Sequence, residues 1–126
     1  MIVGTGIDLA EVSRIKASIE RYGLKFVNRI YTPLEIAYVE RKANRFERYA
    51  ARFAAKEAGM KALGTGWRHG VRWVDLEVVN LPSGRPTLQL HGAAHAIAGK
   101  LGVTRINLSL THTAENAMAH VIFEKE

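Results

Sequence analysis

RFAAKEAGMKALGTG, residues 52–66, ends the longest helical pattern in the chain, and the other segments are arranged around it. The pattern begins near Phe46, and its apolar positions recur with the 3.6-residue period of a helix. These positions are Phe46, Ala50, Phe53 and Met60. Glu57 falls on the same stripe, so the pattern predicts a carboxylate where a core residue is expected.

A carboxylate on the buried side of a helix must be protonated, paired with a cation or bound to a metal, because an unpaired buried charge costs several kcal/mol. Lys61 follows Glu57 by four residues, and an exposed pair in that order stabilises a helix by about 0.2–0.5 kcal/mol. An ordinary surface salt bridge is therefore one interpretation. Gly64-Thr65-Gly66 ends the helix, since glycine readily adopts the left-handed conformation, and this turn predicts backbone amides open to a ligand.

The length of 126 residues and the hydrophobic fraction of 48% predict a single globular domain over residues 1–126. No apolar run approaches the roughly 20 residues of a membrane span, and the N-terminus lacks a signal-peptide pattern, so we expect a cytoplasmic protein with no membrane partner. The absence of cysteine excludes disulfides and leaves carboxylate or histidine to bind a hard metal ion. The net charge of +6 predicts an anionic partner, which could be nucleic acid, a phosphorylated small molecule or an acidic protein.

Residues 2–9 alternate as a strand. Asp8 ends a face that otherwise carries Gly4 and Gly6, which predicts space for a bulky group beside its carboxylate. The alternative is that Asp8 only caps the helix that follows.

Residues 11–22 have the pattern of an amphipathic helix with a basic outer face. The inward positions are Val12, Ile15, Ile19 and Tyr22, and the outward positions are Arg14, Ser18, Arg21 and Lys25. The basic face predicts docking of an acidic partner, and a solvated face without a partner is the alternative.

Thr32-Pro33-Leu34-Glu35 is a capping box, which predicts a short helix from Pro33 to about Arg41. In the long helix, Arg45, Arg48 and Arg52 share one face, as phosphate recognition requires. A solvated helix face is again the alternative.

The C-terminal half completes an α+β pattern. It is predicted to contain a loop over 67–73, a hairpin of strands 74–79 and 87–90 around the turn 81–86, a helix over 92–101, and strands over 105–111 and 117–123. His112 lies between two threonines at a strand end, where it is able to bind a phosphate or move a proton, and plain exposure is the alternative. We therefore expect a small antiparallel sheet packed with one long central helix and shorter helices.

Two carboxylates on inward faces, a lysine, a glycine turn and several arginines together indicate a magnesium site for a phosphate ester. Magnesium is typically held by one or two carboxylates plus substrate phosphates, and Asp8 and Glu57 are the candidates. The arginines, Lys61 and the turn amides would neutralise the remaining phosphate oxygens.

Four motifs in this order resemble the holo-acyl-carrier-protein synthases, the small 4′-phosphopantetheinyl transferases. They are GIDLAEVSRI (6–15), FVNRIYTPLE (26–35), RFAAKEAGMKALGTG (52–66) and LSLTHT (108–113), and they span nearly the whole chain. The resemblance implies the fold of that family and transfer of the 4′-phosphopantetheine arm of coenzyme A to a serine of apo acyl carrier protein, in support of fatty acid biosynthesis. The other product would be adenosine 3′,5′-bisphosphate.

By the same resemblance, Asp8 and Glu57 match the magnesium ligands and Lys61 would hold the pyrophosphate as the third catalytic residue. The other residues expected at the coenzyme A site are Arg45, Arg52, Gly64, Thr65, Gly66, Arg85, Thr111 and His112. Some family members have serine at the position of Thr111, which keeps the hydroxyl. The group that deprotonates the acceptor serine stays open among Glu57, Asp8 and a metal-bound water.

The family's carrier protein is acidic, so the resemblance implies that Arg14, Arg21 and Lys25 dock this partner. It also implies a homotrimer. The competing class is a basic nucleic-acid-binding module, which accounts for the net charge of +6 but not for inward-facing carboxylates. The chain has no aromatic-rich binding strand or zinc pattern, and we expect no nucleic-acid partner.

Overall fold

The computed structural model describes residues 1–66 and 68–126, and it has the predicted α+β architecture. Trp67, at the start of the predicted loop, lies outside the described residues. The elements in chain order are β1 (Ile2–Glu11), α1 (Val12–Tyr22), α2 (Leu24–Ile30), α3 (Pro33–Glu40), α4 (Arg45–Leu63), η1 (Trp73–Asp75), β2 (Leu76–Asn80), β3 (Pro86–Leu90), α5 (Gly92–Leu101), β4 (Arg105–His112) and β5 (Asn116–Glu124).

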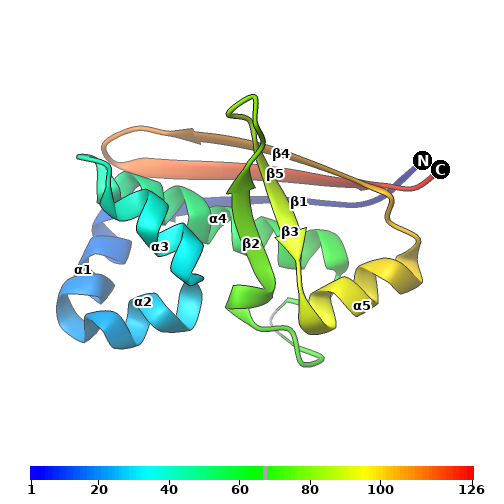
Figure 1. Ribbon diagram of the computed structural model, residues 1–126, viewed down its shortest axis with the longest axis horizontal. Helices are drawn as coiled ribbons and strands as arrows, with labels where there is room; N and C mark the ends of the chain where they lie inside the picture. Colours follow the sequence, from blue (N-terminus) through cyan, green and yellow to red (C-terminus); the bar gives the residue numbers. More distant parts are fainter. Residues whose placement is uncertain (67) are drawn as a thin grey trace.

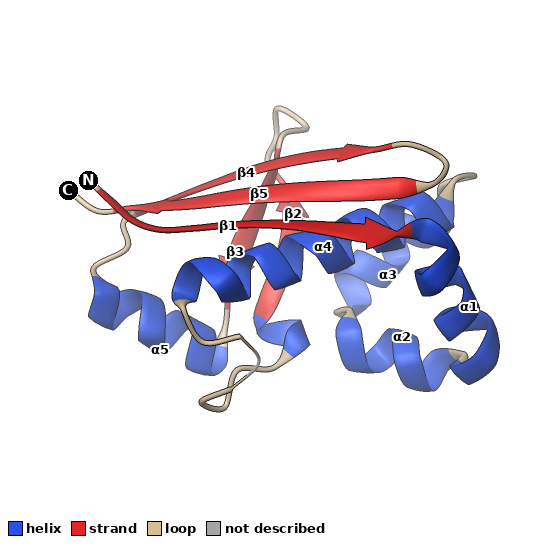
Figure 2. Ribbon diagram, turned by 180° about the vertical axis from the view of Figure 1, so that it is seen from behind, coloured by secondary structure: helices blue, strands red, loops and turns tan. Residues whose placement is uncertain are grey.

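The strands form a three-stranded antiparallel sheet in the order β1-β5-β4 and a separate β2-β3 hairpin. Helix α4 lies along one face of the three-stranded sheet, and the hairpin crosses beside this helix, with β2 against α4 and β3 against β4 (Figure 1). Helices α1, α2 and α3 gather at one end of α4, and α5 lies at the other end (Figure 2). The long helix is therefore the centre of the molecule.

The glycines of β1 make room for α4 and not for a ligand. A Cβ atom at Gly6 would overlap the carbonyl oxygen of Ala58, and one at Gly4 would overlap that of Ala62. The predicted space for a bulky group beside Asp8 is thus filled by the helix backbone. The other face of β1 stays uncovered, and Ile7 and Leu9 on it are 56% and 55% exposed.

Helix α4 is buried on most sides, which corrects the single apolar stripe predicted from the sequence. Its small residues let neighbouring elements approach closely, and Ala54, Ala55 and Ala58 are fully buried. The fully buried charged residue of this segment is Lys56, whereas Glu57 is only partly buried. The sequence pattern therefore predicted the buried charge at Glu57, whereas the structure has it at the neighbouring Lys56.

Lys56 and Glu35 form an ion pair with no exposed side-chain area, at 2.7 Å between Nζ and Oε1. The ammonium group of Lys56 also donates to the carbonyl oxygen of Leu76 at 2.7 Å, and the backbone N–H of Val78 donates to Glu35 Oε2 at 3.0 Å. Glu35 also completes the predicted capping box with Thr32 at the start of α3. The pair thereby joins α3, α4 and β2.

Two elements differ from the prediction. Helix α2, which the sequence analysis did not assign, follows Gly23, whose φ of 58° ends α1. Its seven residues are too few for a helical period to stand out. The predicted strand over 74–79 begins only at Leu76, because the residues before it form the 3-10 turn η1, and the N-cap residue Arg72 donates its backbone N–H to Asp75 Oδ2 at 3.0 Å.

Among the helices in the described ranges 1–66 and 68–126, none combines the length and apolar character that crossing a membrane requires.

Candidate active site

Asp8, Glu57 and Lys61 come together where the end of β1 crosses α4. The ammonium nitrogen of Lys61 lies 3.6 Å from Asp8 Oδ1 and donates to the carbonyl oxygen of Ile7 at 3.1 Å. Lys61 on α4 therefore forms its ion pair with Asp8 on β1. The alternative interpretation, a surface salt bridge between Glu57 and Lys61 within the helix, required a different pair. The structure thus brings the three predicted catalytic residues to one place.

The environment of Glu57 favours its protonated form. Burial, followed by the negative charge and hydrogen-bonding contact of Asp8, raises the pKa of Glu57 from 4.5 to about 7, against the opposing effect of Lys61. Two carboxylates that share one cation are short of positive charge. Such a cluster binds a further cation favourably.

The unpartnered oxygen of Asp8 fits a metal ligand. Asp8 Oδ1 accepts from the N–H of Leu9 at 2.9 Å, while Oδ2 is buried and, with Glu57 ionised, has no hydrogen-bond partner among the described residues. Asp8 does not cap α1, because Glu11 holds the N-cap position of that helix. In the described ranges, histidine and acidic residues nowhere gather in groups of three or more to hold a metal, so an ion here would complete its shell with phosphates and water, as Mg²⁺ commonly does.

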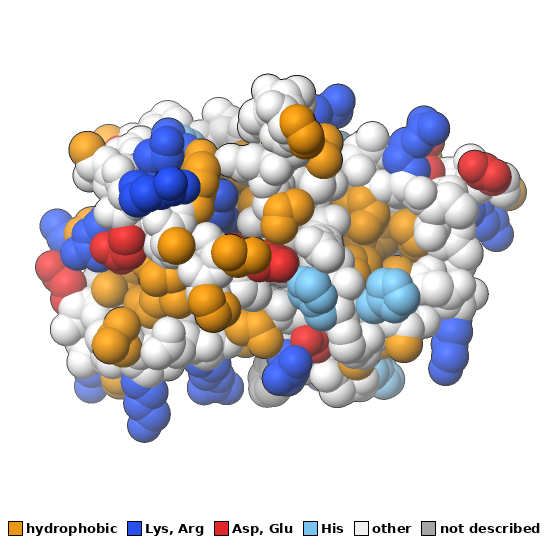
Figure 3. Space-filling view, in the orientation of Figure 1, with side chains coloured by type: hydrophobic (Ala, Val, Ile, Leu, Met, Phe, Trp, Pro, Cys, Tyr) orange, Lys and Arg blue, Asp and Glu red, His pale blue; other side chains and the backbone are white. Residues whose placement is uncertain are grey.

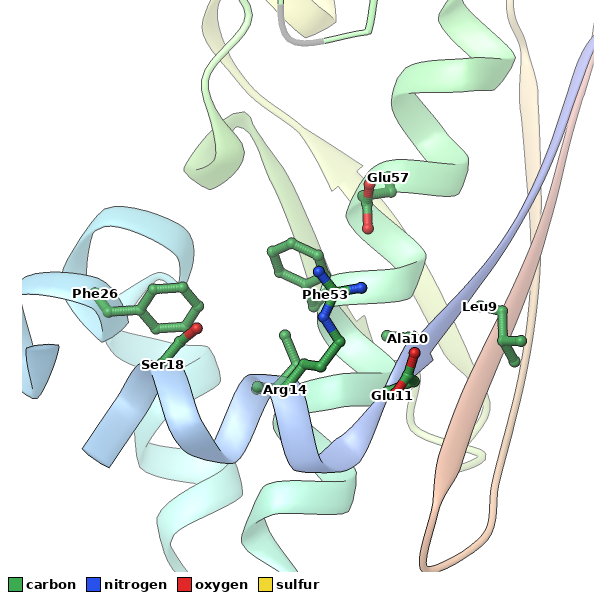
Figure 4. Close-up of a pocket in the computed structure, with 9 residues that line it drawn as sticks. Leu9, Ala10, Glu11, Arg14, Ser18, Phe26, Phe53 and Glu57 are labelled. Atoms are coloured by element: carbon green, nitrogen blue, oxygen red, sulfur yellow. The ribbon is translucent and has the colours of Figure 1, made fainter. Parts of the chain in front are cut away.

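A cavity of about 380 Å³ opens beside Glu57 and reaches α1. Its walls come from β1, α1, α2 and α4, and Arg14 and Ser18 of α1 line it together with Phe26 and Phe53 (Figure 4). In this view Arg14 projects from α1 toward the side of α4 that carries Glu57. The cavity therefore connects the basic helix to the carboxylate cluster.

The basic helix face lies on the surface as predicted. Arg14 and Arg21 are exposed on α1, and Lys25 is exposed at the start of α2. Figure 3 shows basic side chains projecting from this end of the molecule. Tyr22 was expected to point inward, but it is 54% exposed, because the chain turns away at Gly23 and leaves the last turn of α1 uncovered.

Arg48 and Arg52 both contact Tyr38, and Arg48 donates to the phenol oxygen at 3.5 Å. The guanidinium of Arg52 lies 4.5 Å from the ring centroid, and Arg52 is only 4% exposed, with a buried Nε that has no partner among the described residues. Burial acts to raise the pKa of the Tyr38 phenol, but its hydrogen bond with Asn80 and the nearby cations lower it overall. Arg45 does not join this cluster: it pairs with Glu40 at 3.4 Å and lies over Phe46.

Two backbone amides of the turn Gly64-Thr65-Gly66 are hydrogen-bonded to α4, although the sequence predicted open amides. The N–H groups of Gly64 and Thr65 donate to carbonyl oxygens of the last turn of α4, at 3.0 and 3.2 Å. The expectation that the turn amides are open to a ligand is therefore wrong for these two. Gly64 has a left-handed φ of 79°, as predicted for the residue that ends this helix.

The remaining predicted residues lie on other elements. Arg85 is exposed in the turn between β2 and β3. Thr111 is exposed on β4, opposite Met118, on the uncovered sheet face. His112 is only partly exposed, and its Nδ1 lies 3.0 Å from Glu47 Oε1 in the first turn of α4.

Sequence reasoning missed the partners that arise from distant segments. Lys56 meets Glu35 and His112 meets Glu47 across 21 and 65 residues, respectively. Phe26 was not assigned to the cavity, because α2 itself was not recognised. The capping box was the only sequence signal for Glu35. It predicts the hydrogen bonds with Thr32 but not the buried ion pair with Lys56.

Comparison with known proteins identifies the family. Residues 4–119 match the family model of the 4′-phosphopantetheinyl transferase superfamily. A holo-[acyl-carrier-protein] synthase from Solibacter usitatus (strain Ellin6076) is 76% identical over 124 residues, which cover 98% of this chain and 99% of that protein. The crystal structure of holo-[acyl-carrier-protein] synthase from Neisseria meningitidis superposes with a TM-score of 0.91 at 32% identity, covering 99% of this chain and 100% of the other.

A holo-(acyl-carrier-protein) synthase from Bacillus anthracis, solved in complex with CoA (3′,5′-ADP), gives a TM-score of 0.82 at 36% identity, with 100% of this chain and 99% of that chain covered. These matches extend over the segments that carry the carboxylate cluster, the cavity and the glycine turn. The chain therefore belongs to the 4′-phosphopantetheinyl transferase superfamily, among the holo-acyl-carrier-protein synthases.

Proposed function

We propose that this protein transfers the 4′-phosphopantetheine group of coenzyme A to a serine of an apo acyl carrier protein, in a Mg²⁺-dependent reaction at Asp8 and Glu57. The products are holo acyl carrier protein and adenosine 3′,5′-bisphosphate, and the reaction serves fatty acid biosynthesis. The observation that carries the proposal is the buried, unpartnered Asp8 Oδ2 beside a Glu57 whose pKa is raised to about 7. Two neighbouring carboxylates repel each other when both are ionised, and a bound cation removes this repulsion and is held by them.

The reaction exchanges one phosphorus–oxygen bond for another. The serine oxygen attacks the phosphorus that bears pantetheine, and the bond from that phosphorus to the bridging oxygen of the pyrophosphate breaks, so the adenosine part leaves with both of its phosphates. Mg²⁺, when bound by Asp8 and Glu57, supplies charge stabilisation for the pyrophosphate. The ammonium group of Lys61, already beside Asp8, neutralises a further phosphate oxygen.

We assign acceptance of the serine proton to the carboxylate of Glu57. In the metal-free protein the pKa of Glu57 is about 7, and a bound cation would lower it, so the carboxylate would be ionised and able to accept a proton at neutral pH. Glu57 also lines the cavity that reaches α1, so an acceptor arriving along that helix meets this carboxylate. Glu57 would thus act both as a metal ligand and as the base, whereas Asp8, whose Oδ1 is shared with Lys61 and the N–H of Leu9, would act as a metal ligand alone.

Coenzyme A carries further phosphates, and several cations of the chain are suited to them. Arg52 offers a guanidinium held against Tyr38 with an unused Nε, which favours a phosphate ligand. The other residues proposed for coenzyme A are Arg45, Lys61, Gly64, Thr65, Gly66, Arg85, Thr111 and His112.

The acidic carrier protein is proposed to dock on Arg14, Arg21 and Lys25. The Arg14→Glu variant should weaken carrier binding, more so at low salt than at high salt, because exposed charges are screened within about 10 Å at 0.1 M salt. Coenzyme A affinity should stay nearly unchanged, and Lys100→Glu on α5 is a control with the same charge reversal at the other end of the molecule. Equal losses for both ligands in a titration would argue against docking.

We also propose a homotrimer, as the family resemblance implies. The uncovered sheet face supports a contact between copies, because Ile7 and Leu9 of β1 and Met118 of β5 are exposed there. Large apolar side chains gathered on one sheet face are typical of an interface. A cytoplasmic location remains a prediction from the sequence.

The decisive experiment is the intact mass of an apo acyl carrier protein after incubation with this protein and coenzyme A, with and without Mg²⁺. We expect a metal-dependent gain of one phosphopantetheine. Glu57→Gln should lose turnover by on the order of a hundredfold or more, as expected for a group that acts on the transition state. Glu115→Gln, an exposed variant with the same charge change in the β4–β5 turn, should retain it.

No mass gain across several apo carrier proteins, with the protein folded and metal present, would contradict the proposal. Titration with single-stranded nucleic acid would then test the competing class, for which Glu57→Gln should maintain or improve affinity.

A further inference from the structure

Glu47 has no role in the proposed reaction, but its carboxylate contacts His112, which is proposed for the coenzyme A site. Glu47 lies in the first turn of α4, and His112 is the last residue of β4. Glu47 Oε1 and His112 Nδ1 are 3.0 Å apart, and about a quarter of each side chain is exposed, at 27% and 28%. The imidazole is therefore partly accessible while one of its nitrogens is occupied.

Both ends of this contact are held by regular structure. His112 pairs with Ala117 of β5, and the turn between them is closed by Thr113, whose hydroxyl accepts from the N–H groups of Glu115 and Asn116 at 3.2 and 3.1 Å. Glu47 is fixed by the helix that forms the centre of the molecule. The contact thus joins two rigid elements and is not an encounter between two mobile surface chains.

The chemistry of the contact decides where the proton of the ring lies. An ionised carboxylate only accepts hydrogen bonds, so Nδ1 of His112 must carry a proton to make the contact. The remaining nitrogen, Nε2, accepts hydrogen bonds in the neutral ring and donates to an anionic ligand only when it too carries a proton. The ring cannot rotate without breaking the bond to Glu47. A cleft of about 350 Å³ beside Glu47 is also lined by Lys16 and Arg45, so two cations share this cleft with the carboxylate that holds the ring.

We propose that Glu47 is a positioning residue for His112: it holds Nδ1–H and thereby leaves Nε2 as the nitrogen that takes up a second proton and donates a hydrogen bond to a phosphate oxygen of the substrate. This inference rests on the proposed function for the identity of that substrate, coenzyme A. Glu47 does not contact the substrate in this scheme and acts only through the imidazole.

The first test is spectroscopic and does not depend on activity. Nitrogen-15 NMR of the histidine rings at about pH 8.5 distinguishes the two neutral tautomers, and the His112→Asn variant identifies the signal among the five histidines. We expect the Nδ1–H tautomer in the unmodified protein. Glu47→Ala should release the ring to Nε2–H, whereas Glu47→Gln, whose amide oxygen still accepts, should retain much of the Nδ1–H form. An Nε2–H tautomer in the unmodified protein would overturn the proposal.

The second test measures coenzyme A. Glu47→Ala should raise the KM for coenzyme A about tenfold and leave kcat within about twofold, because the lost interaction binds the ground state and the transition state alike. His112→Ala should cause a similar rise, and the double variant should be no worse than His112→Ala, because residues that act through one another are not additive. Glu115→Gln is the matched control and should change neither constant by more than about twofold.

If the increases in KM for coenzyme A of the two single variants multiplied in the double variant, Glu47 would act independently of His112. That result would also overturn the proposal. The two proposals fail separately. Absence of phosphopantetheine transfer by the unmodified protein would contradict the proposed function, while the tautomer and the dissociation constant for coenzyme A, measured calorimetrically, would still report on the Glu47–His112 pair.

Discussion

Glu57 lies between opposing influences: burial and the charge of Asp8 favour its protonated form, and Lys61 favours the ionised one. Because its pKa in the folded protein, about 7, lies above the value of 4.5 expected in the unfolded chain, the folded state binds more protons between these values. The contribution of Glu57 to stability is thus most favourable below about pH 4.5, and it is lost as the pH rises through 7. The residue that serves the reaction therefore destabilises the metal-free protein at neutral pH.

Glu57→Gln should stabilise the metal-free protein at about pH 8 by about 1 kcal/mol relative to about pH 4.5, after allowance for screening of a partly exposed group. Urea unfolding in the presence of a chelator, at both pH values, measures this difference. Glu115→Gln should follow the unmodified protein at both. A Glu57→Gln effect that is the same at the two pH values would argue against the charge repulsion between Glu57 and Asp8.

At the scale of elements, β1 and α4 touch through their backbones, and this close approach places Asp8 beside Glu57. Gly4 and Gly6 provide the approach, because either Cβ would overlap a carbonyl oxygen of α4. The active-site geometry consequently depends on residues that carry no chemistry themselves.

Gly6→Ala should destabilise the protein by about 3 kcal/mol, because the strand must move away from the helix to avoid the overlap. Gly99→Ala on α5, where an added Cβ meets nothing within 4 Å, should instead be neutral or stabilising by up to about 1 kcal/mol. Denaturant unfolding of both variants makes the comparison. A loss below about 1 kcal/mol for Gly6→Ala would mean that the two elements separate easily.

The buried Lys56–Glu35 pair joins three elements beneath the active site. Lys56→Met should cost about 3–5 kcal/mol, since it leaves the carboxylate of Glu35 buried without its cation. The exposed Lys100→Met variant should change the free energy of unfolding by less than about 0.5 kcal/mol. If Lys56→Met unfolded at the same urea concentration as the unmodified protein, the pair would have no structural role.

At the scale of the whole molecule, one face of the three-stranded sheet is packed on α4 and the other is left uncovered. The registers align Leu9 with Met118 and Ile7 with His120, so the exposed side chains of Ile7, Leu9 and Met118 lie close together on this face. An antiparallel sheet normally places polar residues on its solvent face, and this one departs from that pattern at Ile7, Leu9 and Met118.

Ile7→Lys should therefore convert a trimer into single chains, because a charge in the middle of an apolar interface is desolvated without a partner. Light scattering coupled to size exclusion should give three times the chain mass of 14.0 kDa for the unmodified protein and one chain mass for the variant. Leu34→Lys, at a still more exposed apolar residue on α3, should remain a trimer. A single-chain mass for the unmodified protein would contradict the proposed homotrimer.

The sequence by itself determined most helices and strands, the family and the three residues of the carboxylate cluster, because these depend on local periodicity, capping and motif spacing. It did not determine which carboxylate Lys61 would pair with, since a pattern along one helix contains Glu57 but not the strand that carries Asp8. The burial of Lys56 in place of Glu57 likewise depends on α3 and β2, which are distant in sequence.

Only the tertiary structure decided the role of the β1 glycines, the cavity between α1 and α4, and the contact of Glu47 with His112. Each of these features needs two segments to approach within a few ångströms. Helix patterns in a sequence relate residues that are three or four positions apart. The free energy of burying a charged group, and the space left for its neighbours, depend instead on which distant segment packs against it.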